Sequence, residues 1–185
     1  GGKAVAVQGD VAKAADVERL FAEAQKAFGR LDVLVNNAGV YEFASLGDVT
    51  EKQFHRMFDT NVLGLILATQ EAAKHLPEGG SVINIGSVVA IRDAGVPHPA
   101  YAASPGGVLA LTVDLAGEYG RRNVRVNAVL PGMIASPMQA SIGSPSLEIQ
   151  KRMNMLGRMG NVWDIAHSVG FLCSDEASYI TAQVI

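Results

Sequence analysis

The sequence contains only one cysteine, Cys173, among its 185 residues. A single cysteine cannot form a disulfide within the chain or supply a cysteine-based zinc site, and a cytoplasmic protein is therefore expected. The four histidines show no metal-ligand spacing, so no metal site is predicted. Cys173 itself is expected to be a small, buried residue on an apolar helix.

Long apolar runs and a strong excess of one charge are also missing. No stretch reaches the roughly 20 apolar residues that span a bilayer, and the first residues do not resemble a secretory signal. A formal net charge of -3 argues against nucleic acid as the main partner. With 49% apolar and 18% charged residues, the composition fits one globular domain over residues 1–185.

Short runs rich in valine, isoleucine and leucine alternate with segments of helical length. The expected strands are 4–7, 31–35, 81–85 and 124–129, with the beginning of a last strand at 183–185. The expected helices are 17–28, a helix that opens on the Thr50–Gln53 capping box and runs to about 75, 101–119 and 162–172. This alternation predicts an α/β fold with a parallel sheet covered by helices on both faces.

Small and polar residues directly follow four of these strands. They are Asp10, Asn37-Ala38-Gly39, Ser87 and Pro131-Gly132. In open parallel sheets, ligands bind at the carboxyl ends of the strands. The sequence therefore predicts a ligand site along that edge of the sheet.

Several motifs in a fixed order resemble the short-chain dehydrogenase/reductase family over essentially the whole chain. They are Asp10-Val11, Asn36-Asn37-Ala38-Gly39, Asn61-Val62-Leu63-Gly64, Asn84-Ile85-Gly86-Ser87, Tyr101-Ala102-Ala103-Ser104 and Pro131-Gly132-Met133-Ile134-Ala135-Ser136. The resemblance, especially to 3-oxoacyl-reductase-like members, implies a Rossmann-type doubly wound sheet. It also implies hydride transfer between NAD or NADP and a small hydroxyl/carbonyl substrate.

The resemblance implies catalytic roles for Asn61, Ser87 and Tyr101. Tyr101 would exchange a proton with the substrate oxygen, Ser87 would donate a hydrogen bond to the substrate carbonyl, and Asn61 would hold a water in a proton relay. The alternatives are a structural asparagine with satisfied hydrogen bonds, an ordinary serine at a strand end and an amphipathic surface tyrosine.

The resemblance also implies a set of cofactor-binding residues. Asp10 would bind the adenine amino group, although an aspartate at a turn or helix start is the alternative. The backbone of Asn37 to Gly39 would lie beside the adenosine ribose, and Ile134 and Ser136 would hold the nicotinamide carboxamide. The complete set is Asp10, Val11, Asn37, Ala38, Gly39, Ile85, Tyr101, Pro131, Gly132, Ile134 and Ser136.

The sequence departs from the family pattern at Pro105, where the family has a lysine four residues after the tyrosine. That spacing puts the two side chains on one helix face, where the ammonium favours the phenolate. Pro105 supplies no charge, so impaired catalysis is expected. Arg92 in the preceding loop is the one candidate substitute.

A second departure concerns the N-terminal side. No G-x-G-x-x-G turn follows a first strand, and the chain has no initiating methionine. The expectation is a partial domain that lacks the first βαβ unit and the end of the last strand, and that binds a dinucleotide poorly. Without that unit, the strand at 4–7 would either hang loose or pair beside 31–35.

Four further interpretations concern the function and assembly of the chain. A catalytically weak binding or oligomerisation scaffold is the main alternative, whereas a serine hydrolase is disfavoured because Gly86-Ser87-Val88-Val89-Ala90 lacks the nucleophile-elbow glycine. The helices at 51–75 and 99–119 are expected to form a homodimer or homotetramer, with neither nucleic acid nor membrane as partner. The methionine-containing segment 137–159 is expected to close over the substrate as a lid.

Overall fold

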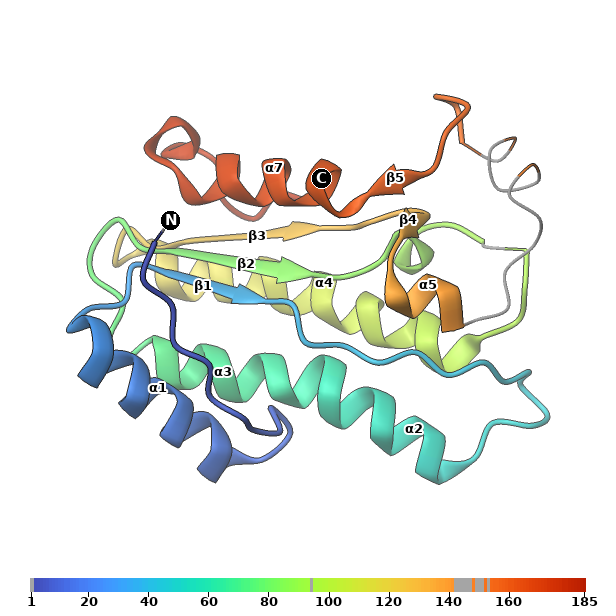
Figure 1. Cartoon of the computed structure of the whole chain (residues 1–185), viewed down its shortest axis with the longest axis horizontal. Coiled ribbons are helices and arrows are strands. Elements are labelled where there is room, and N and C mark those ends of the chain that lie inside the picture. Colours follow the sequence, from blue (N-terminus) through green and yellow to red (C-terminus); the bar gives the residue numbers. More distant parts are fainter. Residues whose placement is uncertain (1, 94, 142–147, 149–151, 153) are drawn as a thin grey trace.

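The fold is a parallel sheet with helices packed against both of its faces (Figure 1). The computed structural model describes residues 2–93, 95–141, 148, 152 and 154–185. The sheet is ordered β1 (Val33–Asn36), β2 (Ser81–Ile85) and β3 (Arg125–Val129), and neighbouring strands are parallel. The predicted α/β class with a doubly wound parallel sheet is confirmed.

The first helix, α1 (Ala14–Phe28), ends at a glycine as the sequence predicted. Gly29 has a φ of 74°, in the left-handed region that favours glycine, and its N–H donates to the carbonyl of Gln25 at 2.7 Å. The chain can therefore leave α1 sharply and enter β1.

The long helix expected after the Thr50–Gln53 capping box has three parts. Both capping-box hydrogen bonds are present, and α2 (Glu51–Phe58) follows them. A single π-helical stretch, Asp59–Leu63, then leads without a break into α3 (Gly64–Ala72). The predicted long helix is therefore present, with a π-helical turn in its middle and its end at Ala72. π-Helical turns are frequent at functional sites, and this one contains Asn61.

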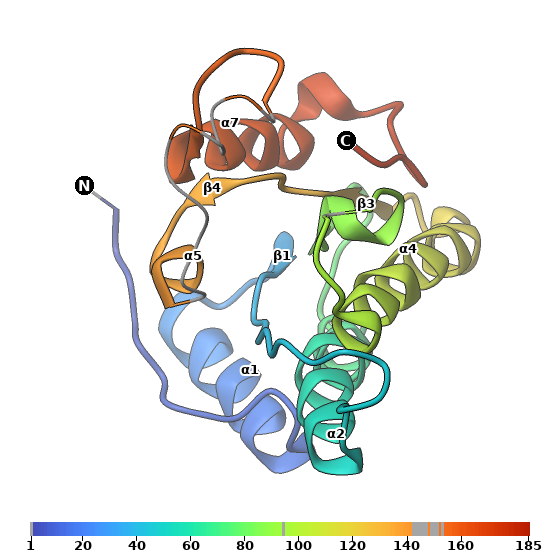
Figure 2. The ribbon, with the colours of Figure 1, turned by 90° about the vertical axis from the view of Figure 1, so that its right-hand side faces the viewer.

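The remaining elements flank or extend the sheet. They are the 3₁₀ turn Val88–Ala90, α4 (Pro99–Gly120), β4 (Ile134–Ala135), α5 (Pro137–Ser141), β5 (Gly160–Asn161), α7 (Val162–Cys173) and the 3₁₀ turn Asp175–Ala177. Helices α1, α3 and α4 lie on one face of the sheet and α7 lies on the other (Figure 2). Strands β4 and β5 form a separate parallel ribbon.

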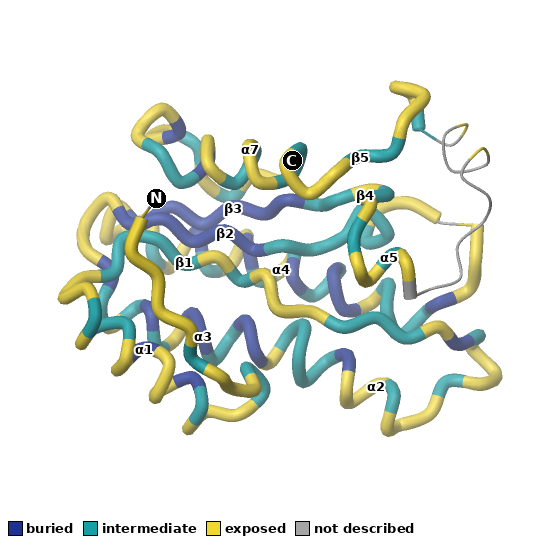
Figure 3. The backbone as a smooth tube through the Cα atoms, viewed as in Figure 1, coloured by how far each residue is buried: buried dark blue, intermediate teal, exposed yellow. Residues whose placement is uncertain are grey.

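Side chains of β2 and β3 alternate between two apolar cores. Val82 and Val126 pack into the core shared with α1, α3 and α4. Ile83 and Val129 belong to the opposite core, where they pack with Leu172 of α7. Because helices cover both faces, these strands are buried along almost their whole length (Figure 3), which explains their nearly continuous apolar sequence.

The predicted strand at Ala4–Val7 was wrong. Residues 2–10 have no regular secondary structure and are almost entirely exposed. Of the two predicted outcomes, the segment therefore adopts the one in which it pairs with no strand. Side chains tie it to α1: Lys3 donates to the carbonyl of Ala27 at 2.7 Å, and Arg19 donates to that of Gln8 at 2.8 Å. A strand needs a neighbour for its backbone groups, and this segment lies beside none, so water must satisfy those groups.

The beginning of the last strand is present beside β3. Val184 forms a parallel bridge with Ala128, and the N–H of Leu130 donates to the carbonyl of Ile185 at 2.7 Å. The segment predicted to be a lid lies partly outside the described residues. Across the described part of the chain, no helix is both long and apolar enough to cross a membrane.

Candidate active site

The carboxyl ends of the three strands bring the predicted site residues to one edge of the sheet. Asn37-Ala38-Gly39 follows β1, Ser87 follows β2 and Pro131-Gly132 follows β3. Two backbone hydrogen bonds join the last two turns: the N–H of Gly86 donates to Val129 at 2.9 Å, and that of Val88 to Pro131 at 3.1 Å. The parallel topology therefore places these loops side by side, as the sequence predicted.

Ser87 and Tyr101 meet at this edge, although they lie on different elements. Ser87 precedes the 3₁₀ turn, where its Oγ accepts a hydrogen bond from Val89, and Tyr101 stands in the first turn of α4. Burial raises the pKa of Tyr101 above its usual 10.0, and a hydrogen bond with Ser87 acts in the opposite direction. Serine hydroxyl and phenol can thus converge on one substrate oxygen.

Two aromatic residues that the sequence analysis did not assign to the site surround Tyr101. The ring centroid of Tyr41 lies 4.6 Å from that of Tyr101, and the ring of His98 lies 5.8 Å away, both edge-on. His98 is buried, and its Nδ1 has no hydrogen-bond partner among the described residues. Burial lowers the pKa of His98, so the imidazole is neutral near pH 7. These rings hold the orientation of the phenol.

The side chain of Asn61 links the loop after β1 to helix α4 through hydrogen bonds. Its Oδ1 accepts from the N–H of Val40 at 2.8 Å, and its Nδ2 donates to the carbonyl of Val40 at 2.9 Å and to Oγ of Ser104 at 3.0 Å. Both amide hydrogens are therefore used by protein atoms. In this arrangement Asn61 acts as a structural clamp, and only a lone pair of Oδ1 remains for a water.

Pro105 lies inside α4, where a lysine would stand in the family pattern. The missing N–H of Pro105 leaves the carbonyl of Tyr101 without its helical donor, and Oγ of the fully buried Ser104 donates to that carbonyl instead at 2.9 Å. No cation among the described residues, Arg92 included, contributes to the pKa of Tyr101. The Ser104 hydroxyl thus replaces the hydrogen bond that the helix loses at Pro105, but no described residue replaces the positive charge of a lysine.

We expect Ser104→Ala to destabilise the protein by about 1–3 kcal/mol, because the carbonyl of Tyr101 then lacks a donor and one amide hydrogen of Asn61 lacks an acceptor. Urea unfolding would measure this loss. The informative control is the same change in a Pro105→Lys background, where a backbone N–H is restored at 105. There the loss should be clearly smaller, and equal losses in both backgrounds would show that Ser104 does not substitute for the missing N–H.

The segment predicted to bind adenine lies against the start of α3. Oδ1 of Asp10 accepts from the N–H of Ala12 at 3.0 Å, so this carboxylate also organises the turn before α1. Val11 packs on Gly64, where an added Cβ would lie only 2.7 Å from Cγ2 of Val11. A glycine at 64 therefore allows this close approach, and the two interpretations of Asp10 are compatible.

The described residues fit the two ends of a nicotinamide dinucleotide. Asn37, Ala38 and Gly39 are exposed residues at the edge of the sheet, and Gly132 is also exposed, with open space where a Cβ would stand. Ile134 lies in β4, and Oγ of Ser136 accepts from the N–H of Gln139 at 3.3 Å. Within the described ranges, no glycine-rich turn links a strand to a helix in a way that would hold the pyrophosphate.

A ladder of buried polar side chains crosses the sheet beneath this edge. Asn36 donates through Nδ2 to Oγ1 of Thr69 at 3.1 Å and to Oδ1 of Asn84 at 2.9 Å. Asn84 in turn donates to Oγ1 of Thr112 at 3.0 Å, and Thr112 donates to the carbonyl of Val108 at 2.7 Å. The ladder links α3, β1, β2 and α4, and so fixes the strand ends that carry the site.

Comparisons with known proteins agree with this architecture. The sequence model of a family described as enoyl-(acyl carrier protein) reductase matches residues 1–185. An uncharacterized oxidoreductase of Methylorubrum extorquens is 48% identical over 189 residues, covering 100% of this chain and 75% of the relative. A 3-oxoacyl-(acyl-carrier-protein) reductase of Staphylococcus aureus is 38% identical, covering 97% and 74% respectively.

Solved structures show the same fold. A short-chain dehydrogenase/reductase variant from Serratia marcescens superposes with a TM-score of 0.94 at 35% identity, over 100% of this chain and 75% of that one. A blue fluorescent protein from a metagenomic library, solved in complex with NADPH, gives a TM-score of 0.90 at 36% identity, over 96% and 72%.

The chain therefore belongs to the short-chain dehydrogenase/reductase family of oxidoreductases, whose cofactor is NAD or NADP. Ser87 and Tyr101 lie near the carboxyl edge of its Rossmann-type sheet, and Pro105 stands four residues after Tyr101. The part of the chain that the structure describes contains no cluster of three His, Cys, Asp or Glu residues able to hold a metal ion.

Proposed function

We propose that this chain is an oxidoreductase domain acting on a hydroxyl/carbonyl pair, with Tyr101 as acid/base, Ser87 as the orienting hydrogen-bond donor and Pro105 as the cause of weak turnover. The observation that supports it is the buried phenol of Tyr101 at the ligand-binding edge, where the Ser87 hydroxyl opposes the rise in pKa that burial causes. NAD or NADP, when bound, supplies or accepts the hydride. The residues of this chain bind and orient the substrate and exchange the proton with it.

In carbonyl reduction, Ser87 donates a hydrogen bond to the substrate oxygen and Tyr101 delivers the proton from its phenol. The raised pKa of Tyr101 keeps the phenol protonated at neutral pH but also makes it a weak acid, so proton delivery is slow. In alcohol oxidation, Tyr101 must instead be ionised. With no cation acting on it among the described residues, the phenol is a poor base there, so both directions are expected to be slow.

The substrate we propose is a ketone on a small or acyl-linked carbon chain. One relative is a 3-oxoacyl-(acyl-carrier-protein) reductase, and its chemistry fits the pairing of one hydroxyl donor with one phenol. Apolar side chains line a shallow cavity beside the site, together with Arg92, Asp93 and His98. The apolar residues are Leu46, Val89, Val96, Pro97, Pro99 and Ala102.

A fluorescence titration with NADPH, followed by turnover of acetoacetyl-coenzyme A, tests the proposal. We expect weak binding and slow reduction, and Tyr101→Phe should abolish the reduction even at an NADPH concentration that saturates the variant. Tyr119→Phe is the matched control, because Tyr119 lies near the other end of α4. If Tyr101→Phe retains full turnover, Tyr101 is not the acid.

A second function, that of a binding or oligomerisation scaffold, is favoured by one observation: among the residues that the structure describes, no cation acts on Tyr101. NADPH binding without any turnover would support it. Exposed apolar residues on the helices predicted to self-associate are Phe54, Leu63 and Val113. Sedimentation measurements would test the proposed homodimer or homotetramer, and a cytoplasmic location stays a prediction.

A further inference from the structure

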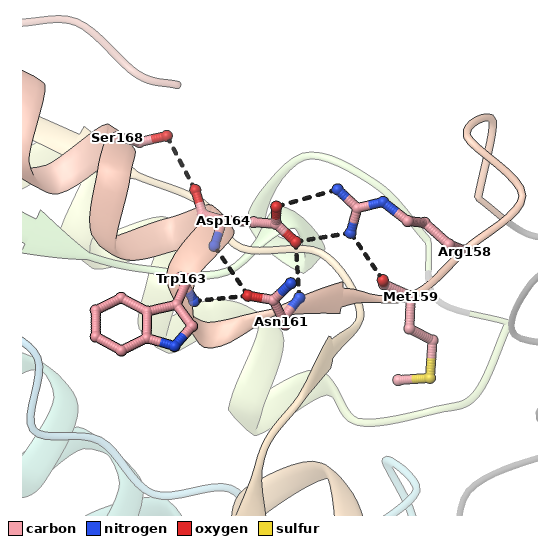
Figure 4. A network of polar contacts seen from close by, with 6 residues as sticks. All are labelled: Arg158, Met159, Asn161, Trp163, Asp164 and Ser168. Atoms are coloured by element: carbon pink, nitrogen blue, oxygen red, sulfur yellow. Dashed lines mark hydrogen bonds and ion pairs between the residues drawn. The ribbon is translucent and has the colours of Figure 1, made fainter.

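A network of polar contacts surrounds the start of α7 (Figure 4). Arg158 donates from Nη1 and Nη2 to the two carboxylate oxygens of Asp164, at 2.7 and 3.0 Å, and from Nη1 to the carbonyl of Met159 at 3.1 Å. The N–H of Asn161 donates to Asp164 at 2.8 Å, and Oδ1 of Asn161 accepts from the N–H of Trp163 at 2.9 Å. One hydrogen-bonded unit therefore joins the guanidinium of Arg158, the Asn161–Asp164 capping box and the end of β5.

This unit holds a ribbon that is too short to be stable alone. Ile134–Ala135 pairs in parallel with Gly160–Asn161, only two residues on each side, and the N–H of Gly160 donates to the carbonyl of Met133 at 3.1 Å. A Cβ added at Gly160 would overlap Cδ1 of Ile134. The position of Ile134 therefore depends closely on the backbone of Gly160.

The ribbon is also part of the site edge. β4 begins two residues after Gly132, and Pro131 accepts a hydrogen bond from the N–H of Val88, next to Ser87. Any displacement of β5 is thus transmitted to β4 and to the loop beside Ser87.

We infer that the Arg158–Asp164 pair and the Asn161 capping box act as a latch that positions Ile134 by holding β5 against β4. Arg158 and Asp164 are positioning residues, because they reach the site only through the ribbon. The link from Ile134 to the nicotinamide rests on the proposed function. The latch itself rests on the contacts around β4, β5 and α7.

The latch is expected to persist in mild acid. The hydrogen bond from Arg158 and then the N–H of Asn161 lower the pKa of Asp164 from 3.8 to about 2. Because the folded pKa is lowered, the contribution of this carboxylate is present above its unfolded pKa and is lost only as the pH falls toward 2. Protection of the ribbon should therefore be the same at pH 7 and pH 5.

Amide hydrogen exchange in the whole chain tests the latch. We expect Arg158→Gln to speed exchange at Gly160 by about 2- to 5-fold, the range for opening an exposed ion pair, and to leave β2 and β3 unchanged. Arg158→Lys should fall between the variant and the wild type, because a lysine keeps the charge but not the bidentate geometry.

Arg30→Gln is the matched control, since Arg30 also binds both carboxylate oxygens of an aspartate, Asp32, at 2.8 and 2.6 Å. It should not alter exchange at Gly160. Unchanged exchange at Gly160 in Arg158→Gln, or equal acceleration throughout β2 and β3, would overturn the latch.

A second measurement separates the latch from the proposed function. Added NADPH should slow exchange around Ile134 in the wild type, and do so less in Arg158→Gln. If NADPH protects nothing in the wild type while Arg158→Gln still loosens the ribbon, the latch stands and the proposed cofactor site is wrong.

Discussion

Replacing Pro105 with lysine is expected to raise the rate of carbonyl reduction by about 10²–10⁴, the usual contribution of positioned acid–base catalysis. A lysine at 105 lies one helical turn after Tyr101, where its ammonium can favour the phenolate. It also restores the backbone N–H that Pro105 lacks. Turnover of acetoacetyl-coenzyme A at one fixed NADPH concentration would measure the gain.

The pH dependence of the reverse reaction gives an independent check. Burial raises the pKa of Tyr101 above 10.0, and oxidation needs the ionised phenol, so oxidation by the wild type should increase only in strongly alkaline solution. A neighbouring ammonium lowers the pKa of a phenol, and the rising limb of the Pro105→Lys profile should therefore move to lower pH.

The variant Pro105→Ala separates the effect of the missing lysine charge from the effect of proline on the helix. Alanine restores the backbone N–H and removes the buried ring, but it brings no cation. We expect little gain in turnover and no displacement of the alkaline limb. A gain equal to that of Pro105→Lys would mean that the proline ring, and not the missing charge, limits the site.

The sequence predicted the regular elements well where their signals are local. The Thr50–Gln53 capping box and Gly29 each fix a helix end through hydrogen bonds within a few residues, so both could be read without the fold. The strand at Ala4–Val7 failed for the opposite reason. A short apolar run that contains valine indicates the tendency to form a strand, but the strand forms only when another one lies beside it.

Only the site residues that belong to recognisable motifs could be predicted from the sequence. Ser87 and Tyr101 were identified by resemblance, and the parallel sheet explains why they meet. Tyr41 and His98 were missed because their contacts with Tyr101 join residues from the loop after β1 and from the turn before α4. The spacing of His98, three residues before Tyr101, was the one available signal, since such a pair can share a side of the chain.

The buried ladder illustrates the same limit. Asn36 and Asn84 were both noted as parts of motifs, yet their hydrogen bond depends on the register in which Asn36 stands opposite Asn84. A shift of one residue would turn both side chains to the other face of the sheet. The residues next to either asparagine in the sequence do not predict that register.

We expect Asn84→Ala to lower the free energy of unfolding by about 2–4 kcal/mol, through a lost buried hydrogen-bond network and a small cavity. Asn84 is fully buried, and its removal leaves one amide hydrogen of Asn36 and one lone pair of Thr112 without a partner. Urea unfolding at neutral pH would measure the loss, with an unchanged m value if the two states keep their compactness.

Two variants show which part of that loss belongs to the ladder. Asn84→Leu fills the space without polar atoms, so stability near the wild type would mean that volume, and not hydrogen bonding, explains the effect. Asn127→Ala removes an equally buried asparagine of β3 whose partners are Ile180 and Gln183. It should destabilise the chain to a similar degree while loosening the C-terminal segment. Asn84→Ala, but not Asn127→Ala, should speed amide exchange at the ends of β1 and β2, because Asn84 links Asn36 of β1 to Thr112 of α4.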